Sequence, residues 1–337
     1  QDMEYAATAQ YKHPLNESYS GITDAYFQEQ VKEGKTDLKY RTPTTYRWSE
    51  ILYRTCPITP ISPPGVCQVL KDLDVRRIFL LGDSLSAQTS ESMWMLLTEG
   101  KYAYPDGFRD HFFKTSISCT DFDYTLQFVR NDTLAESVPI KGYKEKSKNW
   151  IEPYMEDDAR TLLLVNTGPH IKNLDIFREA IDKFFVTMDN MNRPDDIILM
   201  RTSVPGHWNC SRKGIKPFDS YAEYEQDQLE NADQVLVAAY GWDKFEYYNR
   251  YMARAIDDFN LGSPSKKRPL AELLDVFPMT VQRPDGHCSD EFRPELIGTN
   301  DCLHYALPGP VDWWSHLVYN HLEDIAAAER LHKNVAP

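Results

Sequence analysis

The fold of this chain is decided by residues 75–85, which read VRRIFLLGDSL. The part up to Leu81 is a short apolar run that predicts a buried β-strand, and Gly82 ends it. Residues 91–97 carry the pattern of a helix. A strand, a tight turn and a helix in this order are the opening unit of a doubly wound α/β sheet.

Two further apolar runs predict strands over 161–165 (TLLLV) and 196–200 (DIILM), with a helix over 175–188 between them. Strands that alternate with helices pack in parallel and are joined by crossover helices. Later segments extend this alternation with a helix, a strand and a final helix, over 228–260, 270–277 and 312–331. We therefore predict a three-layer α/β/α fold around a mostly parallel sheet, with loop-rich elaborations.

Residues 1–50 are polar and aromatic with little periodicity, and we expect them to wrap over the domain as an N-terminal arm. Neither an internal repeat nor a low-complexity linker divides the chain. Its 337 residues with 42% hydrophobic content are an ordinary size for one α/β enzyme. Residues 51–337 are therefore predicted to form a single catalytic domain.

The formal net charge of −14 repels phosphate backbones, so nucleic acid is not expected as a partner. The sequence has no run of about eighteen apolar residues, and its start, Gln1-Asp2-Met3-Glu4, has neither the basic nor the apolar region of a signal peptide. We interpret the chain as already processed, or cut from an anchored precursor, without a membrane anchor of its own.

Six cysteines without a CxxC pair favour disulfides in an oxidising compartment, with the connectivity left open. Three triplets for N-glycosylation point to the same compartment: Asn16-Glu17-Ser18, Asn131-Asp132-Thr133 and Asn209-Cys210-Ser211. The expected location is therefore secreted or in the lumen of the Golgi and secretory pathway, with N-glycans attached.

Ser84 is the candidate nucleophile, because it follows the carboxyl end of the predicted first strand, where open α/β sheets build their sites. Gly82 allows the backbone to turn sharply, and the start of the next helix supplies N–H groups for an oxyanion. The competing interpretation is structural, since Asp83-Ser84 before a helix is also a plausible capping pair.

His304 is the candidate base, with Asp301 three residues before it as the acid that orients the imidazole. A serine becomes a useful nucleophile only when a base accepts its proton. Asn166 follows the strand over 161–165 and has an amide that could donate to an oxyanion, although a turn-forming asparagine is an equal alternative.

The chain resembles, over residues 34 to about 325, the SGNH/GDSL-like acyl-esterase domain of plant trichome birefringence-like proteins and of related fungal capsule polysaccharide O-acetylation proteins. The blocks that carry the resemblance occur in the order of the family. They are Gly34-Lys35-Thr36-Asp37, Tyr46-Arg47-Trp48, Gly82-Asp83-Ser84-Leu85 with Gln88 and Glu91-Ser92, Asn166-Thr167-Gly168, Arg201-Thr202-Ser203 with Pro205 and His207, Arg283-Pro284-Asp285-Gly286-His287, Asp301-Cys302-Leu303-His304-Tyr305, Leu307-Pro308-Gly309-Pro310 and Asp312-Trp313-Trp314.

The resemblance implies an SGNH-hydrolase-like fold and an acyl-Ser84 intermediate, with His304 as base and Asp301 as its orienting acid. The implied oxyanion donors are the Ser84 N–H and Asn166. Further candidates are Gly107 and Arg201 for the oxyanion, and Trp208, His207 and Trp313 for contacts with a sugar, although core packing is the more frequent role of a tryptophan. The expected partners are an acetyl donor and a polysaccharide or oligosaccharide acceptor, and no cofactor or metal is expected.

Other kinds of site and function fit parts of the same pattern. His287, Cys288, Cys302 and His304 could suggest zinc, but their spacing is not compact and an oxidising compartment disfavours free thiolates.

The same triad would serve a polysaccharide O-acetyltransferase or a secreted carbohydrate O-acetylesterase, in which water takes the acetyl group. A third possibility is a carbohydrate-binding or structural protein that keeps the fold without turnover.

Overall fold

In its described part, the computed structural model has a six-stranded mixed sheet with helices on both faces. The residues that it describes are 58–99, 112–135, 148–208, 210, 216–232, 241–262, 267–288, 301–305, 307 and 309–335. The N-terminal arm predicted for residues 1–50 lies outside this part of the chain.

The main sheet has the strand order β2-β3-β1-β4-β5-β6, with β1 and β4 in its centre. Strand β1 is parallel to β3 and β4, β4 is parallel to β5, and β5 is parallel to β6. Among these six strands only β2 is antiparallel, at the edge next to β3. The strands span Arg77–Gly82 (β1), Phe112–Ser118 (β2), Asp123–Arg130 (β3), Thr161–Val165 (β4), Ile197–Arg201 (β5) and Leu270–Leu274 (β6).

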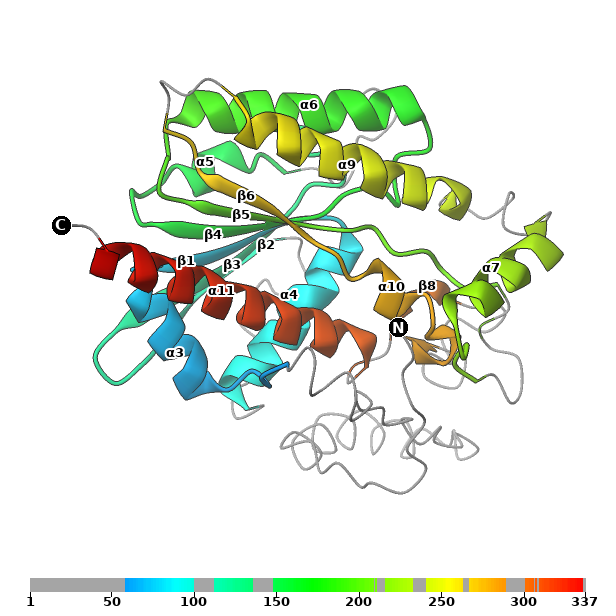
Figure 1. Ribbon diagram of the computed structural model, residues 1–337, viewed down its shortest axis with the longest axis horizontal. Helices are drawn as coiled ribbons and strands as arrows, with labels where there is room; N and C mark the ends of the chain where they lie inside the picture. Colours follow the sequence, from blue (N-terminus) through cyan, green and yellow to red (C-terminus); the bar gives the residue numbers. More distant parts are fainter. Residues whose placement is uncertain are drawn as a thin grey trace, which may run out of the picture.

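Helices cover both faces of the sheet. Figure 1 shows α5, α6 and α9 on one face and α3, α4 and α11 on the other. Strands β7 and β8 form a separate two-stranded ladder, and β8 contacts α4. The remaining bounds are Pro63–Asp72 (α3), Ser84–Thr98 (α4), Ile151–Tyr154 (α5), Leu174–Met191 (α6), Tyr221–Glu230 (α7), Trp242–Lys244 (η1), Phe245–Asn260 (α9), Phe277–Thr280 (α10), Pro284–Gly286 (η2), His287–Cys288 (β7), Asp301–Tyr305 (β8) and Pro310–Val335 (α11).

The sequence pattern of the central strands follows from these layers. Every residue of β1, β4 and β5 is buried, because helices cover both faces of the sheet. Edge strand β2 instead alternates between buried and exposed positions. This arrangement confirms the predicted α/β fold with a mostly parallel sheet, and the strands expected over 161–165, 196–200 and 270–277 are present within a few residues.

The prediction of one long helix over 228–260 is wrong. The described part of that range holds the end of α7, the short 3₁₀ turn η1 and then α9, which begins at Phe245. Gly241 adopts a φ of +64°, a left-handed conformation that a continuing α-helix cannot contain. The interruption lets α9 start afresh and pack beside α6 before the chain enters β6.

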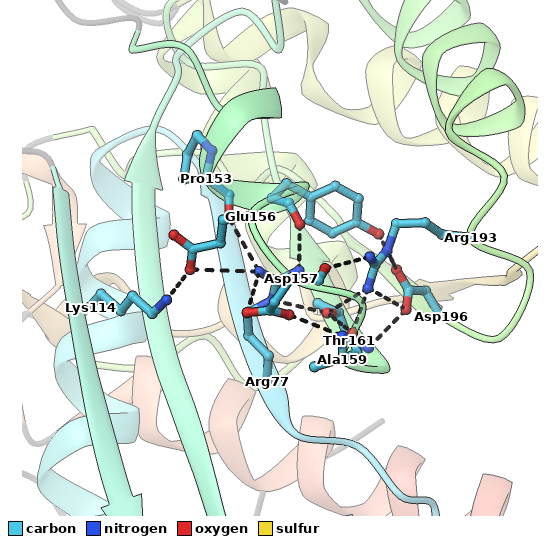
Figure 2. Close-up of polar contacts among 10 residues, drawn as sticks. Arg77, Lys114, Pro153, Glu156, Asp157, Ala159, Thr161, Arg193 and Asp196 are labelled. Atoms are coloured by element: carbon cyan, nitrogen blue, oxygen red, sulfur yellow. Dashed lines mark hydrogen bonds and ion pairs between the residues drawn. The ribbon is translucent and has the colours of Figure 1, made fainter.

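A polar network, drawn in Figure 2, holds the amino ends of the central strands together. Ser84 follows the other, carboxyl end of β1. Arg77, which begins β1, donates from Nε to Thr161 Oγ1 at 3.0 Å and from Nη2 to the Tyr154 carbonyl at 2.5 Å. Arg193 donates to Asp196 at 2.6 Å, and Asp196 accepts from the Thr161 N–H at 2.8 Å. Each charged group is paired, which is the condition for burying it at tolerable cost.

Two disulfides confirm the expected oxidised state for four of the six cysteines. Cys67 in α3 is bonded to Cys119, and Cys210 is bonded to Cys302 in β8. Cys56 and the side chain of Cys288 lie outside the described residues.

Among the helices that the structure describes, none combines the length and the apolar character needed to cross a membrane.

Candidate active site

The turn after β1 presents Ser84 at the carboxyl edge of the sheet. Gly82 has a φ of +153°, and a Cβ atom there would lie 2.3 Å from the Asn166 carbonyl oxygen and 2.4 Å from Ser86 Oγ. Only glycine fits this close approach between neighbouring strand ends. The chain can therefore leave β1 sharply and place Ser84 as the first residue of α4.

Asp83, not Ser84, caps helix α4. Its Oδ1 accepts a hydrogen bond of 2.8 Å from the Leu85 N–H, and its backbone has the extended conformation of an N-cap residue. Asp83 is 0% exposed, and burial raises the pKa of its carboxyl group. Because the capping role falls to Asp83, the Ser84 hydroxyl takes part in a different contact.

That contact is with His304, whose Nε2 lies 2.7 Å from Ser84 Oγ although the two residues are 220 positions apart. A neutral imidazole with an unprotonated Nε2 accepts the serine proton in this geometry, which is the arrangement of an activated nucleophile. The hydrogen bond brings together the two most important residues predicted from the sequence.

Strand β8 carries His304 and pairs irregularly with β7. His287 pairs with Tyr305 and Cys288 pairs with Asp301, so three residues of β8 bulge between the two pairs. In a regular strand, residues three apart point to opposite faces, whereas a bulge removes this constraint. The bulge therefore permits Asp301 and His304 to act on the same side, although the Asp301 side chain lies outside the described part of the structure.

Gln88, one turn after Ser84 in α4, fastens the helix of the nucleophile to the strand of the base. Its Nε2 donates to the Tyr305 carbonyl at 2.6 Å, and its Oε1 accepts from the Tyr305 N–H at 3.1 Å. Both bonds go to the residue next to His304. Sequence reasoning placed Gln88 in a motif but gave it no role, because a contact with a backbone 217 residues away leaves no local pattern.

The predicted oxyanion residues have different positions. Asn166 follows β4, is 1% exposed, and donates from Nδ2 to the Arg201 carbonyl over 3.4 Å. Arg201 is also 1% exposed, with its guanidinium 4.4 Å from the centre of the Trp314 ring. Its positive charge lowers the pKa of buried Asp83, against the larger effect of burial. Arg201 thus supports the cap of α4 from the interior, and Gly107 lies outside the described residues.

The three predicted sugar contacts are also dissimilar. Trp208 is 36% exposed on the loop after β5, as a stacking residue must be. His207 is 1% exposed, so a sugar cannot reach its ring, and both of its ring nitrogens are already within hydrogen-bonding distance of protein atoms. Trp313 is partly buried near the start of α11, with its ring edge-on to His316 at 5.2 Å.

A polar cluster that sequence reasoning missed lies beside the nucleophile turn. Arg130, the last residue of β3, is in register with Gly82 and donates to Asp132 Oδ1 at 2.9 Å. His170, after β4, has its Nε2 3.6 Å from Asp132 Oδ2. The signal was weak because β3 mixes Asp, Thr and Gln with apolar residues, so its carboxyl end was not recognised.

The glycan expected at Asn131 does not fit the folded chain. Asn131 is 1% exposed, and its Nδ2 donates to the carbonyls of Ala135 at 2.6 Å and Lys148 at 2.9 Å. A sugar on this nitrogen would replace these bonds and would need space inside the protein. Asn16 and Asn209 lie outside the described residues.

Comparison with known proteins gives the family context for this geometry. Residues 145–321 match the family model described as PC-Esterase, the GDSL/SGNH-like acyl-esterase family found in Pmr5 and Cas1p. The matched segment contains His304 but begins after Ser84, so the assignment of the serine depends on its hydrogen bond to His304.

Individual relatives extend the match to most of the chain. Protein trichome birefringence-like 25 of Arabidopsis thaliana is 24% identical over 90% of this chain and 73% of its own length. Protein trichome birefringence-like 20 of the same plant is 29% identical over 88% of this chain and 66% of its length. Xyloglucan O-acetyltransferase 1 of Arabidopsis thaliana is 49% identical, over 44% of this chain and 32% of its length. The chain belongs to the GDSL/SGNH-like acyl-esterase family.

Proposed function

We propose that this protein is a polysaccharide O-acetyltransferase that works through an acyl-Ser84 intermediate. The observation that carries the proposal is the 2.7 Å contact between Ser84 Oγ and His304 Nε2 at the carboxyl edge of the sheet. Relatives named xyloglucan O-acetyltransferase, from Arabidopsis thaliana and Populus trichocarpa, support a polysaccharide acceptor.

In the first half-reaction, Ser84 Oγ attacks the carbonyl carbon of an acetyl donor while His304 Nε2 takes the hydroxyl proton. The new oxygen–carbon bond gives a tetrahedral oxyanion, which collapses as the donor's acyl bond breaks and its leaving group receives the proton from His304. Asp301 is proposed to orient the imidazole and to stabilise the imidazolium. This step leaves acetyl-Ser84.

In the second half-reaction, a sugar hydroxyl gives its proton to His304 Nε2 and attacks the acetyl carbon. The bond to Ser84 Oγ breaks, and the serine takes the proton back. Water can take the same path, so transfer requires that the sugar hydroxyl is held in position and that solvent is kept out. Acceptor binding therefore decides between a transferase and an esterase.

The oxyanion is proposed to bind to the Ser84 N–H and the Asn166 amide. Ser84 is the first residue of α4, where helix N–H groups carry partial positive charge. Asn166 Nδ2 makes a long bond of 3.4 Å to the Arg201 carbonyl. Such a bond is weak and can be exchanged for a stronger one to a negative oxygen.

Trp208 is proposed as a platform for a sugar ring. Its neighbour His207 donates from its backbone N–H to the Cys302 carbonyl at 3.0 Å, which ties this loop to the strand of His304. The exposed indole thus projects from a segment that is fixed close to the triad.

The two disulfides support a site of action in an oxidising compartment of the secretory pathway or outside the cell.

The proposal is tested by mixing the protein briefly with an aryl acetate and measuring its intact mass, with and without xyloglucan or xylan-type oligosaccharides. We expect an acetyl adduct on Ser84 that passes to an oligosaccharide. Loss of the adduct only to water, with every acceptor, would show an esterase instead. The absence of both adduct and turnover with several donors would favour a binding protein.

Removal of the two hydrogen bonds between the Gln88 side chain and the Tyr305 backbone is expected to slow acetyl transfer. Gln88→Ala deletes both bonds to the Tyr305 backbone and frees β8 to shift relative to Ser84. Misplacement of a catalytic group by about 1 Å costs on the order of 100-fold in rate, so we expect kcat to fall about 10- to 100-fold. Steady-state kinetics with an aryl acetate measures this effect.

Gln68→Ala is the matched control, because Gln68 is exposed in α3 and donates to Asp72, one turn away. We expect parental kinetics from this variant. Gln88→Glu keeps an acceptor for the Tyr305 N–H but loses the donor to its carbonyl, so its rate should also fall. A parental kcat in Gln88→Ala would show that the hydrogen bonds from Gln88 are not required to hold β8 in position.

A further inference from the structure

Two buried histidines, in contact with each other, lie next to β8, the strand that carries His304. His207 follows β5 and His287 begins β7, and each is 1% exposed. Their Nδ1 and Nε2 atoms, respectively, are 2.6 Å apart. On its other side, His207 Nε2 is 2.7 Å from the Val281 carbonyl, and His287 Nδ1 is 2.9 Å from the His304 carbonyl.

These three contacts require three ring protons. A carbonyl oxygen only accepts, so His207 Nε2 and His287 Nδ1 must each carry a hydrogen. The contact between the two rings needs one more hydrogen, because two bare nitrogen lone pairs at 2.6 Å repel. Two neutral imidazoles hold two N–H groups in total. The arrangement therefore needs one proton beyond neutrality.

The surroundings determine which ring holds the extra proton. Burial lowers the pKa of His207 to about 4, but His287 is buried to the same extent, so the stacking of His287 on Tyr305 is the geometric difference that assigns the extra proton to His287 and leaves His207 Nδ1 as the acceptor. His287 then donates from both nitrogens as an imidazolium. Its ring is stacked on Tyr305, with centroids 4.2 Å apart, and the face of an aromatic ring attracts a cation.

The charged and titratable groups around the pair come from three elements. Asp285 and Arg283, at η2, form an ion pair with Nε to Oδ1 at 2.9 Å, and the Asp285 charge favours a cation at His207 while the Arg283 charge opposes it. Tyr305 in β8 stays neutral, because burial holds its pKa well above the ordinary value. Tyr224 in α7 lies with its ring 6.1 Å from His207, and burial raises its pKa as well.

We propose that His287 is a positioning residue for His304, and that it acts as part of a His207–His287 pair that holds one excess proton, carried by His287. The pair fixes the peptide of His304 by a charge-assisted hydrogen bond to its carbonyl. The effect on activity rests on the proposed function. The pair holds this bond below its macroscopic pKa and loses one of its three hydrogen bonds as the pH rises through that pKa.

The protonation state is tested first by a measurement that needs no catalysis. Nitrogen-15 NMR of histidine-labelled protein reports whether each ring nitrogen carries a hydrogen, and the His207→Gln and His287→Gln variants assign the signals. We expect hydrogens on both nitrogens of His287 and on Nε2 of His207, and one coupled loss at alkaline pH. Two singly protonated rings at neutral pH would overturn the proposal, whether or not the protein transfers acetyl groups.

The effect on the site is tested by the pH profile of acetyl transfer. The parental rate is expected to fall at alkaline pH, where the pair loses its excess proton. His287→Phe keeps an aromatic ring but loses both donors, and we expect kcat to fall about tenfold and this alkaline limb of the profile to disappear. His287→Asn retains an N–H for the His304 carbonyl, so it should recover most of the rate and still lack the alkaline limb. His321→Gln is the control and should keep the parental profile, because His321 lies in α11 and is paired with Glu272 of β6. A parental profile in His287→Phe would refute the positioning role.

Discussion

Ser84→Ala is expected to lower acetyl transfer by about 10⁴-fold or more and to leave no acetyl adduct on the protein. The variant removes the oxygen that lies 2.7 Å from His304 Nε2, and this is the oxygen on which the acyl intermediate forms. Intact-mass analysis after brief mixing with an aryl acetate detects the adduct, and steady-state kinetics measures the rate.

The fold should tolerate this change, because the cap of α4 is made by the Asp83 side chain. Thermal unfolding is therefore expected near the parental temperature. Ser90→Ala is a matched control in the same helix, where the Ser90 hydroxyl donates to the Ala87 carbonyl one turn back. It should keep the adduct and the rate. A Ser84→Ala protein that still accumulates the adduct would exclude Ser84 as the nucleophile.

The central part of the fold could be predicted from the sequence because it is buried on both faces. The runs that became β4 and β5 are uniformly apolar, and such short runs on either side of a helix are typical of central parallel strands. Strands β2 and β3 could not be recognised in the same way. Three of the four exposed positions of β2 carry polar side chains and the fourth is Phe112, while β3 mixes polar and apolar residues, so tertiary pairing decides their structure.

The candidate site could be predicted as far as its reactive groups. Ser84 and His304 belong to short motifs whose chemistry is recognisable, and the structure brings them into contact. The groups that hold them in position could not be predicted. Gln88 and His287 act on backbone atoms of β8, and a hydrogen bond to a distant backbone places no requirement on the partner's side chain. Only the folded chain shows which strand they reach.

The disulfide between Cys210 and Cys302 is expected to stabilise the fold and to position the site as well. It closes a loop of 92 residues, and its removal should lower the free energy of unfolding by about 4 to 5 kcal/mol. Cys302 lies two residues before His304, and its carbonyl accepts from the His207 N–H at 3.0 Å. We therefore expect the Cys210→Ala/Cys302→Ala variant to lose acetyl transfer by about tenfold per folded molecule.

The second disulfide, between Cys67 and Cys119, separates these two effects. It closes a loop of 52 residues, which corresponds to about 4 kcal/mol, but it joins α3 to the segment before β3, away from the strand that carries His304. Its double alanine variant should therefore be destabilised to a similar extent and keep the parental rate per folded molecule. Urea unfolding and kinetics at a temperature where both variants are folded make the comparison. Equal loss of rate in the two variants would mean that the bond at Cys302 acts through stability alone, since general loosening of the fold affects both proteins alike.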